Sequence, residues 1–177
     1  NIMSDMYAST AIENVGKYLA RAVRDGNDME AREGMAFANT LSGVVMCVSV
    51  TTAEHSLEHA MSAFHPDLPH GAGLIMISKA FYEFFIEKHA CDERFINMAG
   101  ALGMKDASKP EDFITMLVQL QKDCGVADLK MSDYGIKPEE FDKLATNAVE
   151  TMGGLFAANP HEMTHDDCVS VYRKSYK

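Results

Sequence analysis

The sequence predicts an all-α fold, with roughly eight helices in one bundle. Apolar residues recur every three or four positions along most of the chain, and no stretch shows the strict alternation of a half-buried strand. Capping residues, prolines and glycines separate the periodic stretches by short connections. Because no internal repeat or low-complexity segment interrupts this pattern, residues 1–177 are expected to form a single domain.

Five helices are expected in the first part of the chain, over residues 4–25, 28–50, 52–64, 70–88 and 92–102. Ser4 and Asn27 are the expected N-caps of the first two helices. From Gly34 onward the second helix is apolar on every side, which predicts that it is buried. Its β-branched tail, residues 44–52, is also compatible with a short buried strand. The two prolines of residues 65–69 predict a turn before the fourth helix.

Capping signals indicate the later helices. Ser108 to Glu111 precedes one apolar helical pattern, Lys137 to Glu140 precedes a second, and Thr164 to Asp167 opens the last. The aromatic residues of the fourth helix follow helical spacing, so we expect them to pack in a core rather than to line a cofactor pocket.

Charge and composition exclude several classes of partner. The chain carries 16 Lys and Arg against 26 Asp and Glu, a formal net charge of −10. A nucleic-acid backbone or an anionic membrane surface demands a basic face, so neither is an expected partner. No apolar run approaches the roughly 20 residues that span a bilayer. The four cysteines form no CxxC pair and no signal-peptide pattern follows Asn1, which favours a reduced, cytoplasmic protein.

Four of the seven histidines, His55, His59, His65 and His70, lie within sixteen consecutive residues. His55 and His59 are four residues apart and project from one face of the third helix. The turn can bring His70 back beside them, and converging neutral imidazoles suit a borderline cation such as zinc or ferrous iron. An HxxxH pair alone is also typical of ordinary core or surface histidines. Because Ser56 follows His55, the HExxH pattern is absent and a metalloprotease is disfavoured.

Several segments resemble, in order, the motifs of one enzyme family. Glu54 to Leu74 resembles a metal-binding signature with a ligand histidine, a second histidine four residues later, and Pro-His-Gly opening the next helix. The other matching segments are Asn1 to Asp5, Cys124 to Leu129, Tyr134 to Glu140, and Asn159 to Thr164 followed by Asp167. Over nearly its whole length the chain is similar to the C-terminal helical domain of the iron-containing (group III) alcohol dehydrogenases, which has a dehydroquinate synthase-like fold.

This resemblance implies roles for three histidines. His55 and His70 would be metal ligands for Fe²⁺, with Zn²⁺ as the alternative ion. His59 would be a catalytic and cofactor-binding residue, facing the nicotinamide or the substrate as a proton relay or positioning group. The turn before His70 is one residue longer than in family members, so whether His55 or His59 is the ligand stays open. The remaining ligands and the domain that binds NAD or NADP would lie upstream of Asn1, which makes this chain a piece of a longer protein.

The function implied by the resemblance is interconversion of a primary or secondary alcohol and its aldehyde or ketone with NAD or NADP. Metal-assisted polarisation of the substrate oxygen would accompany hydride transfer to or from the nicotinamide. The 177-residue chain alone is expected to be inactive. A homo-oligomer is a possible state of the intact protein. A stand-alone helical module that binds a metal or a protein partner without catalysis is the alternative. Pro69-His70-Gly71 and Asn159-Pro160 favour the alcohol dehydrogenase branch over polyol dehydrogenases and dehydroquinate synthases.

Overall fold

A computed structural model describes all residues, 1–177, and contains eight α-helices and no strand. The all-α class expected from the sequence is confirmed. Residues 1–50 and 91–127 form one compact unit, here called unit 1, and residues 51–90 and 128–177 form a second, unit 2. The assignment of residues 1–177 to a single domain stays a prediction.

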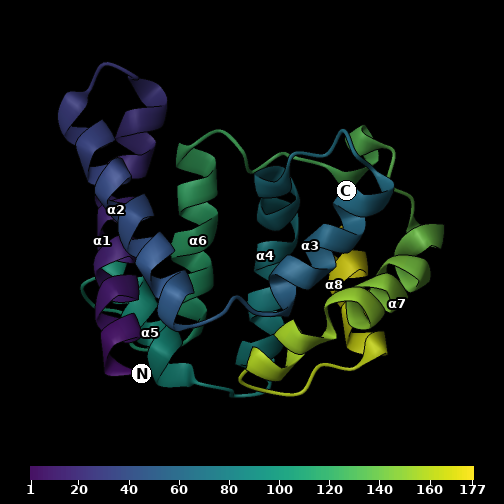
Figure 1. Cartoon of the computed structure of the whole chain (residues 1–177). Helices are drawn as coiled ribbons and strands as arrows, with labels where there is room; N and C mark the ends of the chain where they lie inside the picture. Colours follow the sequence, from purple (N-terminus) through teal and green to yellow (C-terminus); the bar gives the residue numbers. More distant parts are fainter. The chain divides into compact units, whose positions relative to one another are not determined.

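Unit 1 is built on an antiparallel pair of long helices, α1 and α2 (purple and blue in Figure 1). Its four helices are α1 (Ile2–Arg24), α2 (Met29–Val48), α5 (Asp92–Ala101) and α6 (Glu111–Asp123). Ala11, Ala38 and Leu41 are buried where α1 meets α2, and Tyr7, Val15 and Met35 pack partly buried against them. Phe95 of α5 and Phe113 of α6 are buried as well, so the core of unit 1 is not confined to the helix pair.

The caps of α1 and α2 differ from those expected. Asn1, rather than Ser4, is the N-cap of α1, because its Oδ1 accepts the Ser4 backbone N–H at 3.0 Å while the Ser4 hydroxyl donates to the Asn1 carbonyl. Asp28, rather than Asn27, caps α2, and its carboxylate accepts the Ala31 N–H at 3.1 Å. Neighbouring polar residues are all competent caps, so the side chain that faces the free N–H groups of the first turn decides the boundary.

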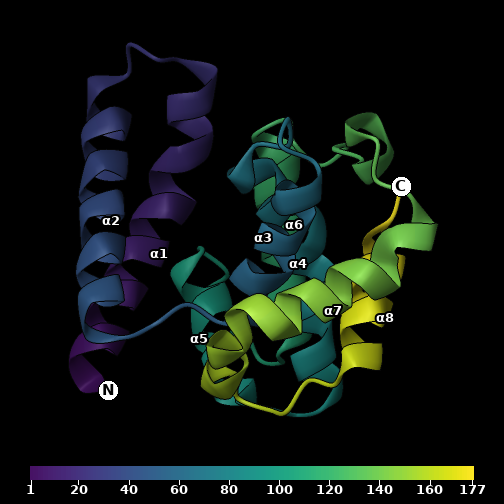
Figure 2. The same cartoon turned by 45° about the vertical axis from the view of Figure 1, so that its right-hand side comes forward.

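Unit 2 holds the other four helices and three 3₁₀ turns. They are α3 (Ala53–Phe64), α4 (His70–Glu87), η1 (Met131–Tyr134), η2 (Pro138–Glu140), α7 (Phe141–Met152), η3 (Gly153–Ala158) and α8 (His165–Ser175). α3 packs against α4 and α7, and α8 packs against the same two helices, so the four surround one core (Figure 2). The core side chains include Leu57, Met61, Ile77, Phe81, Phe85, Leu144 and Tyr172.

Specific contacts fix this core. The Tyr172 hydroxyl of α8 donates to the Leu57 carbonyl of α3 at 2.7 Å, which satisfies a buried polar group. Phe81 and Phe84 each meet Phe85 edge to face, with ring centroids 5.0 Å apart. Phe81, Phe84 and Phe85 are buried, so the expected core packing is confirmed for these three rings.

The expectation that α2 is buried is wrong. Only Ala31, Ala38 and Leu41 are buried within it, whereas Phe37 is 50% exposed and Met46 is 64% exposed. α2 packs against α1 through one narrow face. An apolar sequence on all sides of a helix does not mean that other elements cover its remaining faces. The alternative of a strand over residues 44–52 is also wrong, because α2 continues to Val48. No single helix is long and apolar enough to cross a membrane, and α2 with α3 passes that test only as a bent pair.

Two helical glycines in unit 1 should respond oppositely to alanine. A Cβ at Gly16 of α1 would lie 2.8 Å from the Leu102 carbonyl oxygen, whereas a Cβ at Gly43 of α2 meets nothing within 4 Å. We expect Gly16→Ala to lower the free energy of unfolding by about 1–3 kcal/mol, because backbone must shift. Gly43→Ala should raise it by about 0.5–1 kcal/mol, because it removes backbone freedom from the unfolded chain. Urea denaturation measures both, and stabilisation by both changes would contradict the close contact at Gly16.

The cysteines should differ sharply in reactivity. Burial raises the pKa of the Cys168 thiol to about 12, and the neighbouring Asp167 carboxylate adds to the effect. Cys47 is exposed on α2. Because only the thiolate is nucleophilic, iodoacetamide at about pH 8 should alkylate Cys47 and spare Cys168 until urea unfolds the chain. Mass spectrometry of the digested protein measures this, and equal rates in the folded chain would refute the burial of Cys168.

Candidate metal centre

The turn between α3 and α4 is short and well anchored. α3 closes at His65, whose N–H donates to the Met61 carbonyl at 2.9 Å. The Leu68 N–H then donates to the His65 carbonyl, also at 2.9 Å. Pro69 occupies the N-cap position of α4, and its fixed φ suits the start of a helix. The turn thus reverses the chain and makes His70 the first residue of α4.

Three histidines converge beside this turn. One ring nitrogen from each of His55, His59 and His70 lies within 4.8 Å of the other two. The His70 ring centroid is 5.3 Å from that of His55 and 5.1 Å from that of His59. Nitrogen ligands of one tetrahedral ion at about 2.0–2.1 Å lie about 3.4 Å apart, so small side-chain rotations suffice to close the site. His65 is not part of the group, because its Nε2 lies 3.3 Å from Glu140 Oε1.

The electrostatics of the cluster favour neutral imidazole at His55. Burial lowers the pKa of His55, and the nearby rings of His70 and His59 lower it further, while the Glu58 carboxylate acts in the opposite direction. A neutral ring has a free lone pair, which is the form that binds metal. The cluster therefore has a donor set that fits a borderline divalent ion.

His59, like His70, lies at the surface of the group, but its ring has a different neighbour. Its side chain is exposed, and its Nδ1 lies 2.9 Å from the Met152 sulfur at the end of α7. Its assignment as a catalytic and cofactor-facing residue, and the assignment of His55 and His70 as ligands, stay predictions. Three imidazoles are fewer than the four ligands of a closed zinc site, so the arrangement leaves room for further ligands or a substrate.

Two buried glutamates on α3 were not singled out from the sequence. Glu54 Oε2 accepts the Tyr82 hydroxyl at 3.0 Å, and burial raises the pKa of Glu54 although hydrogen bonds from Ser78 and Tyr82 oppose the rise. Glu58 is fully buried, and its Oε2 contacts Nδ1 of His70. Both residues share the apolar stripe of α3 with Leu57, at helical spacing. An acidic residue on a buried stripe was the available signal, because such charges are rare without a dedicated partner.

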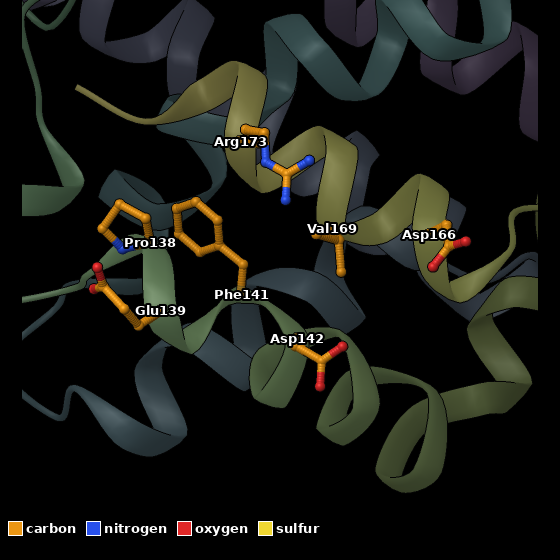
Figure 3. Close-up of a pocket in the computed structure, with 7 residues that line it drawn as sticks. All are labelled: Pro138, Glu139, Phe141, Asp142, Asp166, Val169 and Arg173. Atoms are coloured by element: carbon orange, nitrogen blue, oxygen red, sulfur yellow. The ribbon is translucent and has the colours of Figure 1, made fainter.

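A hollow in unit 2 lies between the start of α7 and α8, apart from the histidine cluster (Figure 3). It has a volume of about 470 Å³ and is lined by Pro138, Glu139, Phe141, Asp142, Asp166, Val169 and Arg173. Its lining carries three carboxylates and one arginine, a negative balance that disfavours an anionic ligand. The hollow shares no residue with the histidine cluster. The cluster is therefore the stronger candidate site.

Comparisons with known proteins agree with the motifs. Residues 1–176 match the model of the Fe-containing alcohol dehydrogenase family, C-terminal. The chain is 29% identical over 175 residues to alcohol dehydrogenase 4 of Schizosaccharomyces pombe, covering 99% of this chain and 40% of that protein. It is 26% identical over 187 residues to the NAD-dependent methanol dehydrogenase of Bacillus methanolicus, covering 98% and 45%.

Solved structures share the fold. The archaeal halo-thermophilic Red Sea brine pool alcohol dehydrogenase bound to NZQ superposes with a TM-score of 0.90 at 34% identity, over 97% of this chain and 44% of that one. The alcohol dehydrogenase of Oenococcus oeni gives 0.89 at 29% identity, over 99% and 46%. The chain thus spans less than half the length of these relatives. On the match over residues 1–176, the chain belongs to the iron-containing alcohol dehydrogenase family and corresponds to its C-terminal part.

Proposed function

We propose that this chain is the C-terminal part of a metal-dependent alcohol dehydrogenase that interconverts an alcohol and its aldehyde or ketone with NAD or NADP. The observation that carries the proposal is the convergence of His55, His59 and His70 in a chain that matches the family model throughout. Relatives act on small alcohols by name, among them a methanol dehydrogenase and a 1,3-propanediol dehydrogenase. A small alcohol is therefore the proposed substrate class.

The proposed roles of the histidines come from the family resemblance, and their convergence supports them. His55 and His70 are the proposed ligands for Fe²⁺, with Zn²⁺ as the alternative, because they match the ligand histidines of the family motif, and each offers an imidazole nitrogen to the point that His59 also faces. The bound ion supplies Lewis-acid polarisation of the substrate oxygen. His59 is exposed, so a substrate or a nicotinamide ring can reach it, and its second nitrogen can accept or donate a proton.

The rest of the active site is proposed to lie in an upstream domain of the parent protein. The relatives have more than half of their length outside the matched part, and this chain contributes three imidazoles to a site that needs further ligands. The upstream part would bind most of the NAD or NADP and carry the remaining ligands. We further propose a cytoplasmic protein whose intact form is able to assemble as a homo-oligomer.

The proposal is tested on the parent gene and its product. The gene should encode, upstream of Asn1, an Asp-x-x-x-His motif and a glycine-rich phosphate-binding loop. The product loaded with Fe²⁺ or Zn²⁺ should reduce NAD or NADP in the presence of a small alcohol, as measured by nicotinamide absorbance. His70→Ala should lower kcat/KM by at least about 100-fold. A parent gene that lacks these upstream motifs, or a folded parent with no alcohol-dependent activity, would favour the non-catalytic helical module instead.

Metal binding by the 177-residue chain provides a separate check. We expect zinc or nickel to bind with a Kd of about 1 μM or weaker, because only three histidines are present, and we expect the chain alone to have no dehydrogenase activity. His55→Ala and His70→Ala should each weaken binding by about tenfold or more. His59→Ala decides whether His59 coordinates. His65→Ala is the matched control, because His65 pairs with Glu140 outside the cluster. Calorimetric titration measures all four, and an equal loss in the control would refute the cluster.

A further inference from the structure

Glu58 has an unusual environment for a carboxylate. Its side chain is 0% exposed, and no lysine or arginine pairs with it. Its Oε1 accepts the Ser62 hydroxyl at 2.7 Å, one helical turn further along α3. Its Oε2 meets Nδ1 of His70 on α4. Both oxygens are therefore occupied, and the only group able to balance a charge there is an imidazole of the candidate metal centre.

The backbone of α4 leaves space for this carboxylate. A Cβ at Gly73 would lie 2.6 Å from Glu58 Cγ and 2.7 Å from Glu58 Oε1, so the Glu58 side chain would have to move away. Gly71, on the same helix, would meet nothing within 4 Å. Glycine at position 73 thus provides the space that the Glu58 side chain occupies, whereas no side chain occupies the space beside Gly71.

We propose that Glu58 is a positioning residue that selects the tautomer of His70. The carboxylate accepts the proton carried on Nδ1 and so leaves the lone pair of Nε2 for a metal ion. Ser62 holds the second oxygen and fixes the direction of the carboxylate. A carboxylate on the far nitrogen of a ligand histidine orients the ring and raises its basicity. The inference rests on the proposed function, because it takes His70 as a ligand.

A role for Glu58 as a direct ligand fits the structure less well. The group of side chains able to share one ion comprises His55, His59 and His70 without Glu58. The two oxygens of Glu58 are already engaged by Ser62 and His70, and its side chain has no exposed surface. The two roles also differ chemically. A glutamine at position 58 keeps an acceptor for the Nδ1 proton, but its amide is a far weaker metal ligand than a carboxylate.

The first experiment needs no metal. Two-bond ¹H–¹⁵N correlation spectra of the apo chain report which ring nitrogen of each histidine carries the proton. We expect His70 in the Nδ1–H form in the wild-type chain and in Glu58→Gln, and the Nε2–H form in Glu58→Leu. Glu54→Gln is the matched control, a buried glutamate one turn earlier on α3 whose hydrogen bond goes to Tyr82. It should leave His70 unchanged. An Nε2–H His70 in the wild-type chain would overturn the proposal.

Zinc titration of the same variants gives the second readout. Glu58→Leu should weaken zinc binding by about 10–100-fold, and Glu58→Gln should recover most of the loss. Gly73→Ala should resemble Glu58→Leu, because its Cβ displaces the carboxylate, while Gly71→Ala should bind zinc as the wild-type chain does. Equal losses in Glu58→Gln and Glu58→Leu would overturn tautomer selection in favour of direct ligation.

The two readouts separate the possible failures. If Glu58→Leu changes the His70 tautomer but neither the wild-type chain nor any variant binds metal, the proposed metal site is refuted, while Glu58 still determines the tautomer of His70. If metal binds equally in all Glu58 variants, the site stands and the positioning role is refuted. Thermal melting by circular dichroism identifies a variant that has lost its fold, and the isosteric Glu58→Gln keeps the test decisive in that case.

Discussion

The return of α4 onto α3 is the constraint on which the histidine cluster depends. α3 alone places His55 and His59 one turn apart, which is a common surface arrangement with little affinity for a metal. The turn at residues 65–69 adds a third ring from a separate helix, and its backbone hydrogen bonds and two prolines remove conformations that would carry His70 away. The core contacts of α4 with α3 and α8 then hold that geometry.

Most of this arrangement was predictable, since local signals determine it. Apolar periodicity locates long helices, and Thr164 with Asp167 forms the expected capping box at the start of α8. The convergence of His55 and His70 follows from the helical spacing and the proline turn. The start of α1 was less predictable, because Asn1 and Ser4 are both good caps and the sequence does not state which of them faces the open N–H groups.

The features that were missed depend on partners distant in sequence. The burial of Glu58 needs both the space at Gly73 and the ring of His70, and no local pattern on α3 specifies either. The expectation that α2 is buried was wrong because a partner was missing rather than overlooked. Its composition resembles that of a core helix, but burial requires a neighbour on every side, and α1 covers only one face. The apolar composition of a helix shows that it could be buried, but only the elements packed against it decide whether it is.

The steric match between Glu58 and Gly73 also bears on how such sequences diverge. A lineage that first shortens the side chain at 58 empties the volume beside α4, after which alanine at 73 becomes tolerable. In the reverse order, alanine at 73 appears while Glu58 is still present, and its Cβ must push the carboxylate out of its place. The order of substitution therefore matters at these two positions. Replacing Glu58 first makes alanine at 73 acceptable, whereas replacing Gly73 first disturbs Glu58.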